Sequence, residues 1–505
     1  MELKTKDYCR FSIGNFTFNG AKFANRALPG DIVNWDGNCN LIKRNKHLLI
    51  VGTLELNSKT KYGMTKRGYP MYLFVPFDRS YPQFIVGSSH KDCSKNCIGI
   101  INFESWDEEV LPRGTLVRIV GQCGDSSAEE EAILLTYHPY KMSKTLDMAI
   151  ELEKNDFIYR NHCPEQTFNI DPVGCMDIDD VLSIVGNEIW ITIADVAERV
   201  SCGSAIDIFA AKQGQTVYCE GKAILPMLPY ELSELRCSLC PGELKPGVTL
   251  KLICDNYGIV KVLWDLTCVK NKKSYDYDTF IEKGTADGIN IQFIQRIAES
   301  ILREKTNDPH KWIEAFMLKY NTEAAELLSI KERGILRKHS GPDKEKWEKY
   351  ASWDKDMIVL ANSAAKYCSV DDPSPNHVGI GSVYCHASSP IRRYADLFNQ
   401  RILKSIIKDD SSISDVEYPV NIEWLNKRQQ DSKRYERDYF FQKNLGVGEL
   451  EGIVLSEKRV WIKTWKRICT WKNTLEPGSC ISLKYFVNQN SRHWKDRIVF
   501  QASQN

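Results

Sequence analysis

Residues Phe168–Asp180 read F-N-I-D-P-V-G-C-M-D-I-D-D and place four carboxylates, those of Asp171, Asp177, Asp179 and Asp180, within ten residues. Carboxylates this close raise one another's pKa and oppose ionisation unless a positive charge lies among them. A hard divalent cation such as Mg²⁺ supplies that charge, because it takes oxygen ligands and is often shared between carboxylates and substrate phosphates. Two such ions can bracket the attacking and leaving oxygens of a displacement at phosphorus. The stretch therefore predicts a metal-dependent site for phosphate chemistry.

Two other interpretations of this stretch are considered. Acidic runs are usually solvated loops, although apolar residues are interleaved with the acids here, namely Ile170, Val173, Met176, Ile178 and Val181. A calcium loop that starts at Asp177 would have Glu188 at its twelfth position, but Val181 and Leu182 stand where a polar residue and a glycine are needed. Spacing alone leaves a catalytic metal site and a structural acidic turn as alternatives.

A second motif, Y-C-H-A-S-S-P-I-R-R-Y-A-D at residues 384–396, contains the adjacent arginines Arg392 and Arg393. A guanidinium group binds phosphate through two parallel hydrogen bonds, which lysine cannot do. An isolated pair of arginines is more often engaged in surface salt bridges. The pair becomes informative because it accompanies the aspartate stretch.

Together, I-D-P-x-x-x-x-D-I-D-D and S-P-I-R-R-Y-x-D resemble the signature of the ribonuclease II / ribonuclease R (RNB) family, and the pattern is most similar to the eukaryotic exosome branch. The resemblance implies a processive 3′→5′ exoribonuclease that hydrolyses single-stranded RNA to nucleoside 5′-monophosphates. It implies that the four aspartates hold two Mg²⁺ ions, with Mn²⁺ as a substitute, and orient the attacking water. Asp179 is expected to be catalytic, Arg392 to neutralise the scissile phosphate, and Arg393 to contact RNA.

Two further catalytic residues are implied by the resemblance. Tyr277 matches an aromatic residue that packs against the 3′-terminal nucleotide, with Tyr275 as the alternative, and either could be a core aromatic. Glu314 matches a glutamate that faces the RNA end. The alternative is a solvated helix residue, because the acidic residue usual next to this glutamate in the family is replaced by Ala315.

The chain departs from the family pattern at a few places. The segment between Tyr277 and Glu314 is shorter than in typical relatives. Three residues replace those usual in the family: Thr192, Gln213 and Gln400.

The 505 residues are too many for one core and predict a multidomain α+β protein. Short strand-like runs separated by turns, and the resemblance, together predict four domains. These are an abbreviated cold-shock β-barrel at 1–45, a second cold-shock barrel of the OB-fold at 46–150, the α/β RNB catalytic domain at 151–445, and a C-terminal OB-fold barrel at 446–505. In the last of these, ten Lys/Arg outweigh four Asp/Glu from residue 451 on. Trp461 and Trp465 are interleaved with these cations, which predicts that they stack on RNA bases.

The overall composition limits the remaining function classes. A net charge of +1 requires any RNA path to be local, and no apolar run reaches the ~18 residues of a membrane span. We expect a soluble, cytoplasmic monomer that binds single-stranded RNA and no membrane, while exosome-like or decay-complex partners are not identified. The seventeen cysteines include a lone C-x-x-C at Cys237 and Cys240, which is too few ligands for a structural zinc site.

Two competing functions remain. One is a catalytically silent RNA-binding regulator with the same fold, which we would expect to have lost an acidic residue or the arginine of the motifs. The retention of all four aspartates and of Arg392 favours the enzyme. The other is a DNA-processing enzyme, because the motifs do not reveal contacts to the 2′-hydroxyl.

Overall fold

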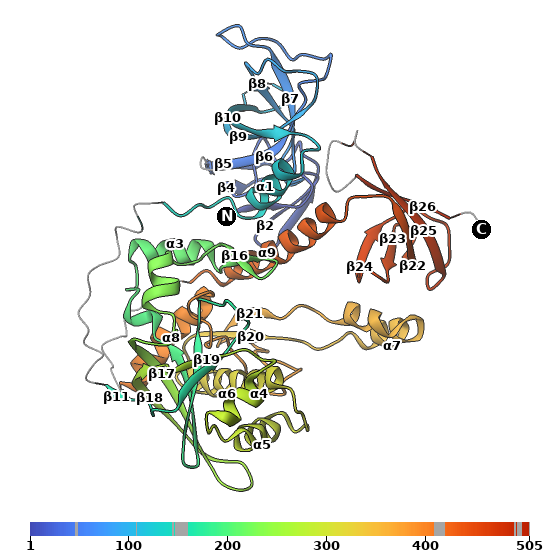
Figure 1. The fold of residues 1–505 in the computed structure, drawn as a ribbon. Helices are drawn as coiled ribbons and strands as arrows, with labels where there is room; N and C mark the ends of the chain where they lie inside the picture. Colours follow the sequence, from blue (N-terminus) through green and yellow to red (C-terminus); the bar gives the residue numbers. More distant parts are fainter. Residues whose placement is uncertain are drawn as a thin grey trace. The chain divides into compact units, whose positions relative to one another are not determined.

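The computed structural model describes residues 1–45, 49–107, 109–143, 146, 160–408, 420–488, 491 and 497–503. The chain's contacts divide it into two compact units, one formed by residues 1–139 and 431–505 and the other by residues 140–430. Figure 1 colours the elements of both units by their place in the sequence. The expected boundary between residues 150 and 151 lies outside the described residues, and the division into four domains stays a prediction.

Two small sheets open the first unit. A three-stranded sheet has the order β1-β2-β3, and β4 pairs with β5. The bounds of these strands are β1 (Leu3–Thr5), β2 (Arg10–Ile13), β3 (Phe16–Asn19), β4 (Ile32–Trp35) and β5 (Cys39–Lys43). Phe11 is buried and stacks on Phe18 with 5.1 Å between ring centroids.

A closed five-stranded barrel follows, with the strand order β10-β8-β7-β6-β9. Its strands are β6 (Leu49–Leu54), β7 (Met71–Pro76), β8 (Phe84–Gly87), β9 (Cys97–Ser105) and β10 (Arg113–Gln122). Phe74 and Phe84 are fully buried, and the helix α1 (Ser126–Tyr137) follows, capped by the Asp125 carboxylate on the N–H of Ala128. This confirms the predicted OB-type barrel. The strand β8 has no clear signal in the sequence, because it is only four residues long.

The last strands of the first unit form a five-stranded sheet in the order β24-β23-β22-β25-β26. They are β22 (Gly448–Ser456), β23 (Arg459–Ile462), β24 (Arg467–Thr470), β25 (Cys480–Val487) and β26 (Ile498–Ala502). Their small core contains Val460, Ile462, Leu483 and Phe500. The sequence predicts an OB-fold barrel here; the described residues give five strands in one sheet, and its closure into a barrel stays a prediction.

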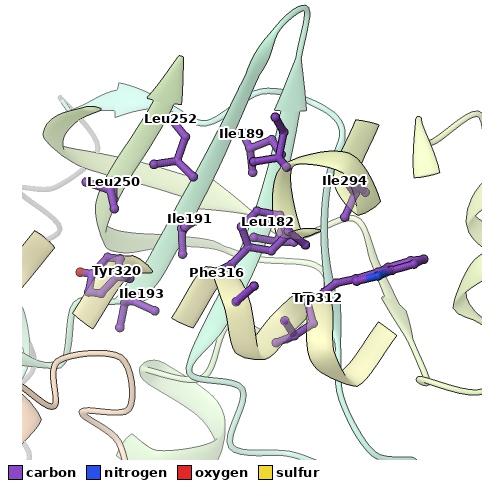
Figure 2. Close-up of a cluster of buried hydrophobic side chains, with 14 of the residues drawn as sticks. Leu182, Ile189, Ile191, Ile193, Leu250, Leu252, Ile294, Trp312, Phe316 and Tyr320 are labelled. Carbon is purple, nitrogen blue, oxygen red and sulfur yellow. The ribbon is translucent and has the colours of Figure 1, made fainter. Parts of the chain in front are cut away.

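The second unit is built on a seven-stranded sheet with the order β11-β18-β17-β14-β13-β12-β19. Its strands are β11 (Asn161–His162), β12 (Thr167–Ile170), β13 (Asp180–Val185), β14 (Glu188–Ala194), β17 (Leu244–Cys254), β18 (Ile259–Lys270) and β19 (Lys273–Tyr275). Alternation along β14 buries Ile189, Ile191 and Ile193 completely. Figure 2 shows these side chains facing Trp312 and Phe316, which come from a helix on that face of the sheet.

The helices of this unit cover the sheet and carry the second motif. α4 (Phe280–Ala286), α5 (Ile291–Leu302) and α6 (Pro309–Ile330) follow the last strand, and α8 (Tyr394–Ile407) begins inside the arginine motif. The many charged residues between about 421 and 444 predict a helix there. The structure has α9 (Ile422–Lys443), and the division between the two units falls within this helix. A hairpin of β20 (Ile335–Lys338) and β21 (Lys366–Ser369) carries α7 (Lys344–Trp353), none of whose residues is buried (Figure 1).

Candidate active site

The aspartate stretch forms the connection between two adjacent strands of the seven-stranded sheet. β12 ends at Ile170, directly before Asp171, and β13 begins at Asp180. The apolar residues of the stretch divide into two groups. Ile170, Ile178 and Val181 are buried, whereas Val173 and Met176 are exposed. The buried residues fix both ends of the connection in the core, so the carboxylates are held on a defined backbone.

Three of the four aspartates have hydrogen-bond partners within the second unit. Asp171 accepts from the Asn169 side-chain amide at 2.8 Å. Asp177 accepts from the Tyr218 hydroxyl at 2.5 Å. Asp179 is 4% exposed, and its two oxygens accept from the main-chain N–H of Ile391 at 2.9 Å and from Nε of Arg392 at 3.1 Å.

The electrostatics of these carboxylates favour a positive charge among them. Burial raises the pKa of Asp171, and the nearby charge of Asp177 raises it further. Burial also raises the pKa of Asp180 well above its usual range, with the charges of Asp171 and Asp179 adding to the effect. Burial raises the pKa of Asp179 to about 7 even though Arg392 opposes the shift. Crowded, partly desolvated carboxylates of this kind are stabilised in their charged form by a cation.

Arg392 brings the second motif to the first. Its Nε donates to Asp179 and its Nη2 donates to Ser389 Oγ at 3.1 Å. The side chain is nevertheless 45% exposed, so part of the guanidinium remains open to a ligand. The charge of Arg392 opposes the rise in the pKa values of Asp171 and Asp180 that burial causes.

Arg393 is engaged differently from its neighbour. Its Nη2 donates to the fully buried Asp396 at 2.7 Å, and Asp396 also accepts from the main-chain N–H of Ser389. Its Nε is buried and without a hydrogen-bond partner among the described residues. The pair Arg393–Asp396 therefore anchors the start of α8, and the geometry distinguishes the exposed Arg392 from the interior Arg393.

The structure distinguishes the two candidate tyrosines. Tyr275 is 5% exposed, packs in the main core and donates its hydroxyl to Asp287 at 2.6 Å. Tyr277 is only partly buried, and burial followed by the charges of Asp171 and Asp180 raises its pKa. Burial of Tyr275 in the core therefore favours Tyr277 as the tyrosine of the site, and its contact with RNA stays a prediction.

Glu314 lies on α6, one helical turn after His310. The His310 ring stacks on Tyr277, with 3.7 Å between centroids and 12° between planes. Residues four apart share one face of a helix, so Glu314 lies on the same face as the ring that touches Tyr277. Glu314 is exposed, and its role in contacting RNA stays a prediction.

The two tryptophans predicted to bind RNA have different environments. Trp461 is 2% exposed, so its ring is a core side chain without a free face for a base. Trp465 is partly buried at the centre of an aromatic cluster with Phe440, Phe441 and Tyr485. The strand β23 turns Trp461 inward, and of the two only Trp465 retains exposed surface.

The carboxylate oxygens of the aspartate stretch are suitable ligands for a hard divalent cation such as Mg²⁺. Among the described residues no three His, Cys, Asp or Glu side chains are gathered as a complete protein metal cage would require. Mg²⁺ is usually held by one or two carboxylates together with substrate phosphates rather than by such a cage. Asp171 and Asp180, whose pKa values are raised mainly by burial, with the charge of Asp171 adding to the rise at Asp180, meet that simpler requirement.

Three residues of the site were not found by sequence reasoning. Tyr218 holds Asp177, His310 stacks on Tyr277, and the buried Ser238 accepts from the N–H of Ile178 at 2.9 Å while donating to the carbonyl of Met176 at 2.6 Å. None has a spacing signal, because each contact joins segments distant in the sequence. Among the three residues that differ from the family pattern, Gln400 has main-chain partners. Its amide NH₂ donates to the carbonyl of Ala194 at 2.7 Å, and its amide oxygen accepts from the N–H of Ala197 at 3.0 Å.

Comparisons with known proteins agree with this arrangement. A sequence model of the RNB domain matches residues 160–287 and 282–409, and a model of the Dis3-like cold-shock domain 2 (CSD2) matches residues 71–138. Exoribonuclease 2 of Buchnera aphidicola is 28% identical over 374 residues, which cover 57% of this chain and 57% of that protein. The probable exosome complex exonuclease RRP44 of Caenorhabditis elegans is 24% identical over 461 residues, covering 72% of this chain and 48% of that protein. The chain thus spans about half the length of these relatives.

Solved structures show the same fold. Mycoplasma genitalium RNase R in complex with ribose methylated single-stranded RNA aligns with a TM-score of 0.79 at 18% identity, covering 99% of this chain and 100% of that one. Yeast Ssd1, a pseudonuclease, aligns with a TM-score of 0.70 at 17% identity, covering 97% of this chain and 80% of that one. The fold is an RNase R-like, multidomain α+β fold. The chain belongs to the RNB family, and its residues 160–409 form the RNB domain. In the described part of the chain, no helix has the length and apolar character needed to cross a membrane.

Proposed function

We propose that this protein is a 3′→5′ hydrolytic exoribonuclease that degrades single-stranded RNA processively to nucleoside 5′-monophosphates. The observation that carries the proposal is the contact between the two motifs, in which Nε of the half-exposed Arg392 side chain donates to Asp179 at 3.1 Å. The pKa values of Asp171 and Asp180, raised mainly by burial, accord with a cation site in the same stretch. Such a site combines acidic oxygen ligands with a cation that can bind phosphate. The RNB domain and the exonucleases among the relatives support the reaction class.

Each residue has a definite task in this proposal. Asp171 and Asp180 would hold Mg²⁺, which when bound polarises the scissile phosphate and lowers the pKa of water. Asp179 fixes Arg392 through its Nε, and the remaining N–H groups of Arg392 would hold the phosphate oxygens as negative charge develops on them. Tyr277 would contact the terminal nucleotide, and Glu314 would lie one helical turn from its stacking partner His310.

A direct assay tests the reaction. Purified protein is incubated with 5′-labelled single-stranded RNA or DNA, with Mg²⁺ or with EDTA, and the products are separated on a gel. We expect shortening of RNA from the 3′ end and release of monophosphates only with Mg²⁺. Endonucleolytic fragments, or equal degradation in EDTA, would contradict the proposal.

A non-catalytic RNA-binding protein of the same fold is the second candidate function, favoured by the fold shared with the pseudonuclease Ssd1. Thermal denaturation separates the two without requiring turnover. Mg²⁺ should raise the Tm of the parental protein, because binding to the folded state alone stabilises it. The rise should disappear in Asp180→Asn. If Mg²⁺ leaves the Tm unchanged and the protein binds RNA without digesting it, the protein is a non-catalytic RNA-binding protein.

A further inference from the structure

The side chain of Asn169 lies against the first aspartate of the stretch. Successive side chains of a strand point to opposite faces, so Asn169 and Asp171 share one side of the chain, while Ile170 between them is buried in the core. Asn169 is 2% exposed, and its Nδ2 donates to Asp171 Oδ2 at 2.8 Å. The main-chain N–H of Asp171 donates to the carbonyl of Tyr275 at 3.0 Å. Both the backbone and the carboxylate of Asp171 are therefore held.

A second buried amide, that of Asn271, holds Asn169 in turn. Asn271 is 2% exposed and directly follows β18. Its Nδ2 donates to Asn169 Oδ1 at 2.8 Å and to the carbonyl of Leu239 at 2.7 Å. Ser274, which pairs with Asn169 where β19 runs beside β12, donates its hydroxyl to the same Asn169 oxygen at 2.6 Å. We call Asn169 and Asn271 the amide pair.

Main-chain groups fix which way each amide of the pair faces. A carbonyl oxygen can only accept, so it is the NH₂ group of Asn271 that contacts Leu239. The main-chain N–H of Lys273 can only donate, and it meets the Asn271 oxygen at 3.2 Å. Because Asn271 presents its NH₂ group to Asn169, the oxygen of Asn169 faces Asn271. The NH₂ group of Asn169 is therefore left to face Asp171.

Asn271 connects the two ends of the aspartate stretch. Toward the first end, it reaches Asp171 through Asn169. Toward the other end, it holds the carbonyl of Leu239, whose N–H donates to the carbonyl of Ile178 at 2.9 Å. Ile178 directly precedes Asp179 and Asp180 in the sequence. One buried side chain thus ties together the places from which the carboxylates project.

The hydrogen-bond donors of two of the aspartates differ in charge. Asp179 accepts from the guanidinium of Arg392, so a positive charge already lies against that carboxylate. Asp171 accepts from a neutral amide, which orients the carboxylate without compensating its negative charge. Among the described residues, the amide bond occupies only Oδ2 of Asp171, so the second oxygen is left for a cation. Carboxylates that bind metal ions are commonly hydrogen-bonded in this way by a residue that does not itself touch the metal.

We propose that the amide pair consists of positioning residues: Asn169 orients the Asp171 carboxylate for a divalent cation, and Asn271 holds Asn169 in the orientation that this requires. The presence of a cation at Asp171 rests on the proposed function, whereas the hydrogen bonds of the amide pair do not. The alternative is a purely structural role, in which the pair only joins β12 to β19. Substitution then lowers stability alone, whereas loss of a positioning residue lowers the affinity for the cation.

Cation binding is measured on the full chain from the electron paramagnetic resonance signal of free Mn²⁺. Adenosine 5′-monophosphate is present, because it supplies a phosphate and cannot be shortened further. Asn169→Leu removes the amide at similar size, and Asn169→Ser leaves a side chain too short to reach Asp171. Asn271→Leu removes the second amide. The matched control is Asn399→Leu, because Asn399 is also fully buried and its NH₂ group donates to two main-chain carbonyls at 2.9 Å. Tm is recorded for every variant.

Positioning residues and structural residues should give different results. Both Asn169 variants should raise the Kd for Mn²⁺ about 10- to 100-fold, as loss of the hydrogen-bond partner of a metal ligand does. Asn271→Leu should raise it too, and should add little to Asn169→Leu because Asn271 acts through Asn169. In digestion of labelled RNA, the Mg²⁺ concentration that gives half the maximal rate should rise by the same factor, while the KM for RNA at saturating Mg²⁺ changes little. Asn399→Leu should lower Tm and leave the Kd for Mn²⁺ at the parental value.

The other outcomes overturn the proposal in whole or in part. If the Asn169 variants lose stability but keep the parental Kd for Mn²⁺, the amide pair is structural. If the effects of Asn271→Leu and Asn169→Leu add fully, Asn271 does not act through Asn169. A parental chain that binds no Mn²⁺ overturns both the proposed function and this inference, whereas parental binding with unchanged variants overturns this inference alone. Should Asn169→Leu fail to fold, the milder Asn169→Ser decides the result.

Discussion

Asp179→Asn isolates the contact that joins the two motifs. The substitution keeps the shape of the side chain and retains one oxygen for the N–H of Ile391. It removes the negative charge and turns an amide NH₂ toward Nε of Arg392, which now donates to Asp179 at 3.1 Å. A hydrogen bond to a charged group contributes about 1.5–3 kcal/mol. If that energy holds Arg392 in place for the reaction, its loss lowers kcat by about 10- to 150-fold.

The stability of the variant should change little. The Asp179 carboxylate is almost completely buried, and burial raises its pKa to about 7, so a neutral amide avoids much of the desolvation cost of the charge. RNA should bind at least as well, because one negative charge near the phosphates is removed. The measured quantities are kcat on 5′-labelled RNA, Kd in EDTA and Tm.

A double-mutant cycle tests the reasoning. If Asp179 acts through Arg392, the effects of Asp179→Asn and Arg392→Ala on kcat should be far from additive. Asp207→Asn is the matched control, because Asp207 is also buried and pairs with an arginine, Arg401, at 2.8 Å. Parental turnover in Asp179→Asn would refute the assignment. Additive effects would mean that Asp179 acts on the metal or the water independently of Arg392.

Three further predictions concern other parts of the second unit. Arg392→Lys keeps the charge but loses the planar fork, so kcat should fall at least about tenfold while the Kd for RNA stays nearly constant; equal turnover would move the phosphate contact elsewhere. Tyr277→Ala should weaken RNA binding or turnover with a small change in Tm, whereas Tyr275→Ala should destabilise the fold by about 3–5 kcal/mol, as removal of a buried aromatic does; the reverse pattern would exchange their roles. Hydrogen bonds from Lys305, Gln295 and the N–H of Thr306 lower the pKa of Glu299 to about 2, so its stabilising contribution is present above pH 4.5 and is lost as pH falls toward 2. Glu299→Gln should therefore lower Tm at pH 7 and have little effect near pH 2, and an equal effect at both pH values would contradict this.

The sequence was most informative where chemistry depends on local spacing. The aspartate stretch could be recognised from the sequence alone, because its four acidic residues alternate with apolar ones. Ile170, Ile178 and Val181 are buried and hold this stretch in the core. The α9 prediction agreed with the structure at both ends, within a residue or so, because a long charged helix is defined by its own residues.

Side-chain direction was not predictable in the same way. Trp461 and Trp465 share one basic, aromatic segment, and only the register of β23 against its neighbours puts the first ring in the core. Tyr275 and Tyr277 are two residues apart, and pairing of β19 with β12 fixes Tyr275 beside the core while the chain leaves the strand before Tyr277. Tyr218 and His310 reach the site through contacts between distant segments, which a single sequence does not encode locally.

The contact between Asp179 and Arg392 spans 213 positions of the chain. A nascent polypeptide therefore cannot assemble the site until the arginine motif has left the ribosome, long after the aspartates have emerged. Because the carboxylates and the guanidinium are supplied by opposite ends of one domain, an interrupted translation product that stops before residue 392 would lack half of the site. The proposed RNA-degrading site would therefore stay incomplete on the growing chain until residue 392 has emerged.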